Sequence, residues 1–181
     1  SSETSEKTAA EAALLLRYVL QRSPDQADAH LLMANAMAHL DDRTAIGAHL
    51  NEAVVADPTR AKQALQISLY LARDVIKIEP RTLLGWWESI TWLESAYLSG
   101  QSLSANSLQS KSELTNDRSE YSSLSPRLSL LAAFAESESD TRLAEVVYRR
   151  LLQLDNKAHI ASNNLAMILS NEERFLDEAM R

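Results

Sequence analysis

The sequence contains no cysteine, and only three glycines and four prolines among its 181 residues. Without cysteine, neither disulfides nor thiolate metal sites can form, although the absence does not decide the compartment, since many periplasmic proteins also lack cysteine. Scarce glycine and proline, together with abundant alanine and leucine, argue against sheets, which need more turn residues and more Val, Ile and Thr. The composition therefore favours an all-α chain.

Positive charge and long apolar runs are also scarce. The formal net charge is −7 at pH 7, and an acidic surface disfavours a phosphate backbone, so we expect no nucleic-acid partner. No apolar run approaches the roughly 18–20 residues of a membrane span and no signal peptide is visible, so we expect a soluble chain, cytoplasmic or periplasmic, without membrane insertion. The chain starts without Met and stops in what reads as mid-helix, and we interpret it as a fragment of a longer protein.

Apolar residues recur at helical spacing along most of the chain. We expect each of the four prolines at a helix boundary, where its missing N–H costs least. Residues 99–125 differ, with ten serines in 27 positions. This composition predicts a flexible linker, with a phosphorylation or docking segment as the alternative. The predicted helices cover 6–22, 27–39, 43–56, 60–78, 81–98, 126–137, 141–154, 158–170 and 173 to the end.

Pro24 and Pro58 each follow an Ala/Leu-rich helix, and two predicted helices lie in the interval from one proline to the next. Two helices in a period of about 34 residues, which this interval matches, are typical of the tetratricopeptide repeat. The chain resembles this family in its alternation of bulky and small residues, which is found at His30, Met33-Ala34, Met37, Ile46, Leu50 and Ala53, again at Leu128, Leu131-Ala132, Ala135, Ala144, Tyr148 and Leu151, and in part at Asn164-Leu165-Ala166 and Leu169.

The resemblance implies a right-handed α-solenoid of antiparallel helix pairs, forming a single array over 1–181. The predicted units are the second half of a unit at 6–24, a unit at 25–58, an enlarged unit at 59–124, a unit at 125–158 and a truncated unit at 159–181. The enlarged unit follows from the interval between Pro58 and Ser122, which is nearly twice the interval between Pro24 and Pro58. Close stacking of helix pairs requires small residues, so we expect four alanines to be fully buried: Ala34, Ala132, Ala144 and Ala166.

No constellation in the sequence predicts catalysis. The chain has no GxGxxG, P-loop or GxSxG motif, and its paired carboxylates fall in turns of an acidic surface. His30 and His49 lie on different helix faces, so we expect no metal site, and nothing indicates a cofactor. In GWWESITWLESAY, Leu83, Trp86, Ile90, Leu93 and Tyr97 share one helix face. We interpret this helix as core, with Trp87 or Trp92 as a partly exposed partner anchor in the alternative.

In the tetratricopeptide family the first helix of each unit lines a concave groove that binds extended peptides or partner helices. Matching positions imply that Leu31, Ser129, Ala133 and Glu136 face such a groove. Ser129 and Ala133 stand where the family's carboxylate clamp has Lys and Asn, so that activity is not carried over. Amides suit a groove because they both donate to and accept from a peptide backbone. The candidate partner contacts are Asn35, His39, Asn163, Met167 and Asn171.

The sequence thus predicts a non-enzymatic scaffold that binds a peptide segment or partner helix of another protein. An uncharged or weakly basic peptide suits the groove best. The alternative is a regulatory or substrate-presenting arm of a multidomain enzyme or secretion assembly whose active part lies elsewhere. A third role is structural, with the ends of the array stacking into homo-oligomers.

Overall fold

The computed structural model describes residues 2–100 and 118–171, with side chains from 4 and from 123 onward in these two ranges. Two compact units divide the chain, Ser1–Asn116 and Asp117–Arg181. Every regular element in the described ranges is helical and no strand occurs there, so the all-α prediction is confirmed for this part of the chain. None of these helices is long and apolar enough to cross a membrane.

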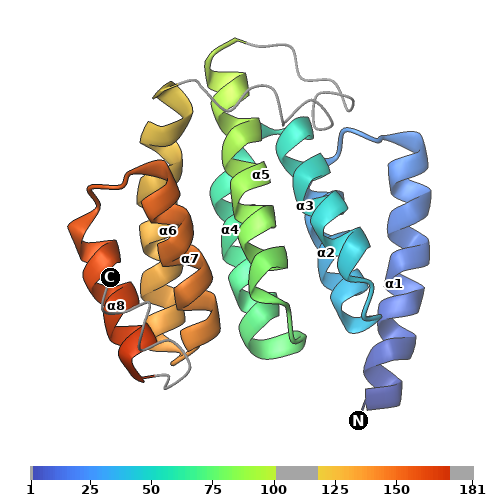
Figure 1. Cartoon of the computed structure of the whole chain (residues 1–181). Helices are drawn as coiled ribbons and strands as arrows, with labels where there is room; N and C mark the ends of the chain where they lie inside the picture. The colour runs from blue at the N-terminus through green and yellow to red at the C-terminus, as the bar shows by residue number, and fades with distance from the viewer. Residues whose placement is uncertain (1, 101–117, 172–181) are drawn as a thin grey trace. The chain divides into compact units, whose positions relative to one another are not determined.

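The first unit contains five α-helices and two short helical turns (Figure 1). Helix α2 packs on both α1 and α3, α3 packs on α5, and α4 packs on α5. The elements are α1 (Ser2–Arg22), α2 (Ala27–His39), α3 (Arg43–Ala56), η1 (Pro58–Arg60), α4 (Ala61–Tyr70), η2 (Leu71–Val75) and α5 (Pro80–Leu98).

The second unit is described over three helices, α6 (Arg118–Ser137), α7 (Thr141–Leu154) and α8 (His159–Asn171). Helix α7 packs on both α6 and α8. Its apolar face is buried against both neighbours and includes Leu143, Val147 and Leu151. The helix predicted from residue 173 onward lies outside the described residues.

A single turn geometry ends α2 and begins α3. The N–H of Asp42 donates to the Met37 carbonyl at 3.0 Å, and the N–H of Asp41 donates to the Ala38 carbonyl at 3.2 Å. Asp41 has a φ of 57°. This is the Schellman arrangement, in which a left-handed residue lets the turn satisfy carbonyls that the helix end leaves open. Asp42 then caps α3, because its Oδ1 accepts from the N–H of Ala45 at 3.0 Å.

The turn between α6 and α7 repeats this geometry. The N–H of Asp140 donates to the carbonyl five residues earlier at 2.8 Å, Ser139 has a φ of 57°, and Asp140 Oδ1 caps α7 at 3.0 Å. The far ends of α3 and α7 also match. Asp57 and Asp155 each accept, through Oδ1, the N–H two residues later, at 3.0 and 2.9 Å. The same helix with the same two ends therefore occurs once in each unit.

Tryptophan packing defines the core of the first unit. Gly47 of α3 lies under the Trp86 ring so closely that a Cβ at this glycine would be 2.3 Å from Nε1 of Trp86. The neighbouring Trp87 is 3 % exposed, and its Nε1–H donates to Ser68 Oγ of α4 at 3.0 Å. Trp86 and Trp87 are thus core residues, and only Trp92 keeps partial exposure. Tyr97, expected on the same face as Trp86, is 55 % exposed because it lies in the last turn of α5.

Three of the four alanines expected in helix contacts are buried. Ala34 is 0 % exposed, and Ala132 and Ala144 are each 2 % exposed. The expectation for Ala166 is wrong, because this residue is only half-buried while its neighbours Leu165 and Leu169 are buried. Helix α8 therefore buries Ala161, Leu165 and Leu169, and not Ala166.

Helix continuity departs from the prediction at two places. The predicted helix 60–78 ends in a π turn over Leu71–Val75, closed by the Ile76 N–H donating to the Leu71 carbonyl at 2.9 Å. From Ile76 the chain is extended toward Pro80. A proline disfavours the helical conformation at the residue directly before it, so the helix does not continue up to Pro80.

The second departure is Pro126, which lies inside α6 and not at its boundary. Helix α6 begins at Arg118, so 118–125 are helical where a linker was predicted, while 101–117 lie outside the described residues. Only one helical N–H is lost at Pro126, and the hydrogen bonds on both sides carry the helix through. Among the described side chains of α6, which start at residue 123, Leu128 is the first that is buried.

Candidate functional site

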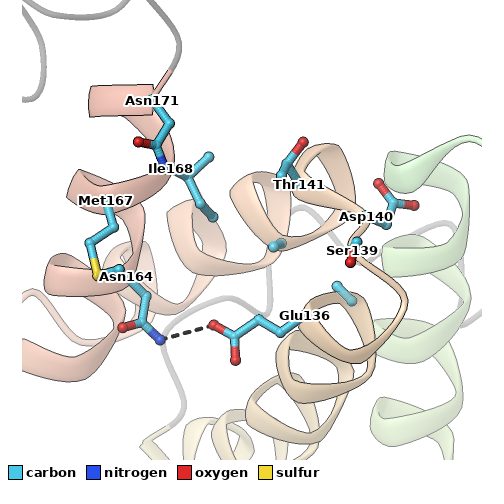
Figure 2. Close-up of a pocket in the computed structure, with 10 residues that line it drawn as sticks. Glu136, Ser139, Asp140, Thr141, Asn164, Met167, Ile168 and Asn171 are labelled. Carbon is cyan, nitrogen blue, oxygen red and sulfur yellow. Dashed lines mark hydrogen bonds between the residues drawn. The ribbon is translucent and has the colours of Figure 1, made fainter.

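Two of the five predicted contact residues lie together in the second unit. Met167 and Asn171, both on α8, line a hollow of about 290 Å³ that faces the turn between α6 and α7. Figure 2 shows them on the same helix as Asn164, with Glu136, Ser139 and the other turn residues on the opposite side. Asn163 is exposed on α8 and does not line this hollow.

A hydrogen-bonded network of three side chains forms the floor of the site. The Tyr148 hydroxyl donates to Glu136 Oε1 at 2.5 Å. Asn164 Nδ2 donates to the same oxygen at 3.1 Å, the bond drawn as a dashed line in Figure 2. Asn164 Nδ2 also lies 2.8 Å from the Tyr148 oxygen, to which it donates. The network joins α6, α7 and α8, and each member fixes the orientation of the other two. We call it the Glu136 network.

Burial keeps the phenol of this network in its donor form. Tyr148 is 4 % exposed, and burial raises the pKa of its hydroxyl above the usual value, with a further rise from the bond to Glu136. Tyr148 therefore remains a neutral donor across the physiological range, while exposed Glu136 accepts. Since the network uses Oε1 of Glu136, its other carboxylate oxygen remains directed outward (Figure 2).

A second hollow, of about 560 Å³, shares Glu136 and Asn164 with the first. Ser129 and Ala133, which the tetratricopeptide pattern implied as groove residues, line it together with exposed Ile160. The two hollows therefore share two members of the Glu136 network, and we refer to both together as the groove over α6 and α8. The groove offers a fixed carboxylate and amide between apolar side chains, the combination that suits recognition of a peptide segment.

Asn35 and His39 lie in the first unit, in a hollow of about 510 Å³ between α1 and α2. His39 is exposed, and its Nδ1 is 3.4 Å from Ser5 Oγ. Asn35 Oδ1 is buried and has no hydrogen-bond partner among the described residues. The expectation that Leu31 faces this groove is wrong: Leu31 is 4 % exposed, whereas Leu32 is 58 % exposed and lines the hollow. Leu32 thus lines the hollow in place of Leu31, beside Asn35 and His39.

His30 and His49, expected on unrelated faces, are in direct contact. Their Nδ1 atoms are 3.1 Å apart, and Nε2 of His30 is 2.9 Å from the Pro24 carbonyl. A carbonyl only accepts, so Nε2 of His30 carries hydrogen, and in neutral His30 the Nδ1 accepts from His49. Burial, followed by the charge of His30 and that of Arg17, lowers the pKa of His49, against a smaller raising effect of Asp42.

The described ranges hold no cluster of side chains of the kind that binds a metal ion. No group of three or more His, Asp or Glu side chains able to hold a metal ion occurs in the residues described. The site that is assembled, the Glu136 network, was missed by sequence reasoning, because Tyr148 and Asn164 fall at positions that the repeat pattern assigns to packing.

Comparison of the chain with protein-family models, with curated proteins and with solved structures finds no match in any of the three. The function is therefore argued from the groove and its residues.

Proposed function

We propose that this chain is a helical-repeat protein of tetratricopeptide type that binds an extended peptide segment of a partner protein. The binding surface is the groove over α6 and α8, and no chemistry is performed there. In this proposal α2–α3 and α6–α7 are antiparallel helix pairs of a right-handed solenoid.

The matched helix ends support the repeat. The interval from Asp57 to Asp155 equals the interval from Asp42 to Asp140, and each pair occupies the same place in the same turn geometry. That shared interval equals the interval from Pro24 to Ser122, from which one ordinary unit and the enlarged unit were inferred. Repeats of this kind expose extended surfaces suited to protein segments.

The Glu136 network is the observation that carries the binding proposal. A surface carboxylate and an amide are held by a buried tyrosine in one orientation, which removes the entropy cost of ordering them when a ligand arrives. Among the described residues that line the 290 Å³ hollow, only Glu136 and Asp140 are charged. They favour a ligand that offers N–H donors, such as a peptide backbone with a Lys or Arg side chain. Exposed Met167 supplies an adaptable apolar contact beside them.

Selection of a random peptide library on the immobilised protein tests the proposal, followed by fluorescence anisotropy with the enriched peptide. Met167→Lys should weaken binding at least about tenfold, because it removes the apolar contact and adds a charge of the same sign as the favoured ligand. Asn163→Ala is the matched control, since Asn163 is exposed on the same helix but lies outside the hollow. Circular dichroism confirms that both variants fold.

Two results would refute the groove assignment. One is a selected peptide that binds wild type and Met167→Lys equally well. The other is a peptide whose binding is abolished by Asn163→Ala alone. In the second case the partner would lie on the outer face of α8 instead of over the Glu136 network.

A further inference from the structure

A row of large apolar side chains on α1 faces solvent. Leu15 is 71 % exposed, Leu14 64 %, Tyr18 54 % and Val19 37 %. These residues share one face of the helix, while Ala9 and Ala13 on the opposite face are buried. Contiguous exposed apolar groups of this size mark interaction surfaces more often than idle ones.

Charged residues of opposite sign end this row. Glu11, Leu15, Tyr18 and Arg22 follow one another at spacings of four, three and four residues, so they form a single stripe along α1. Glu11 is exposed at one end of the stripe, and Arg22 is exposed at the other. The Arg22 guanidinium lies 4.3 Å from the centroid of the Tyr18 ring, which holds its charge on this same face.

We infer that this stripe is a self-association surface, on which α1 of a second copy of the chain packs antiparallel about a two-fold axis. Read in reverse, the stripe is its own complement: Glu11 of one copy opposes Arg22 of the other, and Leu15 opposes Tyr18. One symmetry axis therefore forms both ion pairs and both apolar contacts at once. Leu14 and Val19 oppose each other in the same register and widen the apolar centre.

Other arrangements of two α1 helices are disfavoured by charge. A parallel pairing opposes Glu11 with Glu11 and Arg22 with Arg22. Sliding one helix along the other by one turn in one direction places Lys7 opposite Arg22. Sliding it by one turn in the other direction places Arg22 opposite Leu15. Only the register centred between Leu16 and Arg17 gives opposite charges at both ends of an apolar centre.

The proposed contact is small. One helix from each copy buries less than about 1,200 Å² in total, so the dimer forms at micromolar concentration instead of being permanent. It leaves the groove over α6 and α8 unused, because every residue of the stripe belongs to α1. The surface is thus separate from the proposed peptide site, and either can fail without the other.

Sedimentation velocity over a concentration series measures the association. Wild type should shift from monomer to dimer, and Leu15→Ser/Tyr18→Ser should remain monomeric while keeping its helical circular dichroism, since both side chains are largely exposed. The control is Ile160→Ser, which removes an equally exposed apolar side chain from α8 and should leave the dimer intact. A wild type that stays monomeric, or a dimer lost with Ile160→Ser instead, overturns the inference.

Charge reversal tests the orientation. Glu11→Arg or Arg22→Glu alone places like charges at both ends of the contact and should raise the dimer dissociation constant by about tenfold or more. Combining the two restores opposite charges and should recover most of the affinity. If the combined variant is as weak as the single ones, or if the single reversals have no effect, the antiparallel register is wrong.

Because the chain contains no cysteine, cross-linking of introduced cysteines can test which residues of two copies lie next to each other. Glu11→Cys and Arg22→Cys variants, mixed and treated with a short bis-maleimide, should cross-link with each other more than either does with itself. Asn163→Cys, which is exposed on α8, reports the background from collisions. Self-cross-links of Glu11→Cys that exceed the mixed product would show a parallel pairing and contradict the proposal.

Discussion

Replacing Gly47 with alanine tests the closest contact in the first unit. A Cβ at Gly47 would lie 2.3 Å from Nε1 and 2.8 Å from Cδ1 of Trp86. The ring is rigid and 8 % exposed, so it cannot yield as the end of a flexible side chain would. Relief requires α3 or α5 to move, and overpacking of this kind costs about 1–3 kcal/mol.

Gly85→Ala is the matched control. Gly85 is also helical, but a Cβ there meets nothing within 4 Å. Both substitutions gain the same helix propensity, about 0.8–1 kcal/mol, so the difference between them isolates the clash. We expect Gly85→Ala to raise the free energy of unfolding. The free energy of unfolding of Gly47→Ala should be lower than that of Gly85→Ala by about 1–3 kcal/mol.

Urea denaturation followed by circular dichroism at 222 nm measures both free energies. Repeating Gly47→Ala in a Trp86→Phe background should reduce its cost, because the smaller ring lacks the atoms nearest the new methyl group. Equal stabilisation by Gly47→Ala and Gly85→Ala would refute the reasoning, because it would mean that α3 and α5 do not approach at this point.

Three further outcomes follow from contacts described above. Because the native fold lowers the pKa of His49, the unfolded chain binds the His49 proton first as the pH falls below about 6.5. The free energy of unfolding should therefore decrease from pH 6.5 down to the native pKa. His49→Gln should flatten this part of the pH profile in chemical denaturation. Ser68→Ala leaves the buried Trp87 N–H without its partner and should cost about 1–3 kcal/mol in the same assay, whereas Ser68→Thr retains the hydroxyl. Ser139→Gly should stabilise the second unit by about 0.5–1 kcal/mol, seen as a higher midpoint, because glycine adopts a φ of 57° without strain.

Helix bounds were predictable where polar residues mark the helix ends. The predictions 27–39, 43–56 and 141–154 agree with α2, α3 and α7 to the residue, because Asp42 and Asp140 end one helix and cap the next. The prediction of a helix boundary failed where the helical residues around a proline determined the structure more than the proline itself. Pro126 carries a strong boundary signal, yet helical residues on both sides outweigh its single missing hydrogen bond.

The site was less predictable than the fold. The resemblance to tetratricopeptide repeats implied that Met167 and Asn171 face a groove, and both line the hollow. It could not identify the Glu136 network, because its three members come from three helices and meet only through the spatial register of those helices. Contact between His30 and His49 was missed for the same reason, since spacing on one helix says nothing about a neighbouring helix.

The three tryptophans of the chain, Trp86, Trp87 and Trp92, all belong to α5, and the sequence from 118 to 181 contains none. Intrinsic tryptophan emission therefore reports on the first unit alone, while ellipticity averages over the helices of both. Monitored together in one titration, coincident transitions would mean that the two units melt as one cooperative body. Separated transitions would give each unit its own midpoint from a single unlabelled sample.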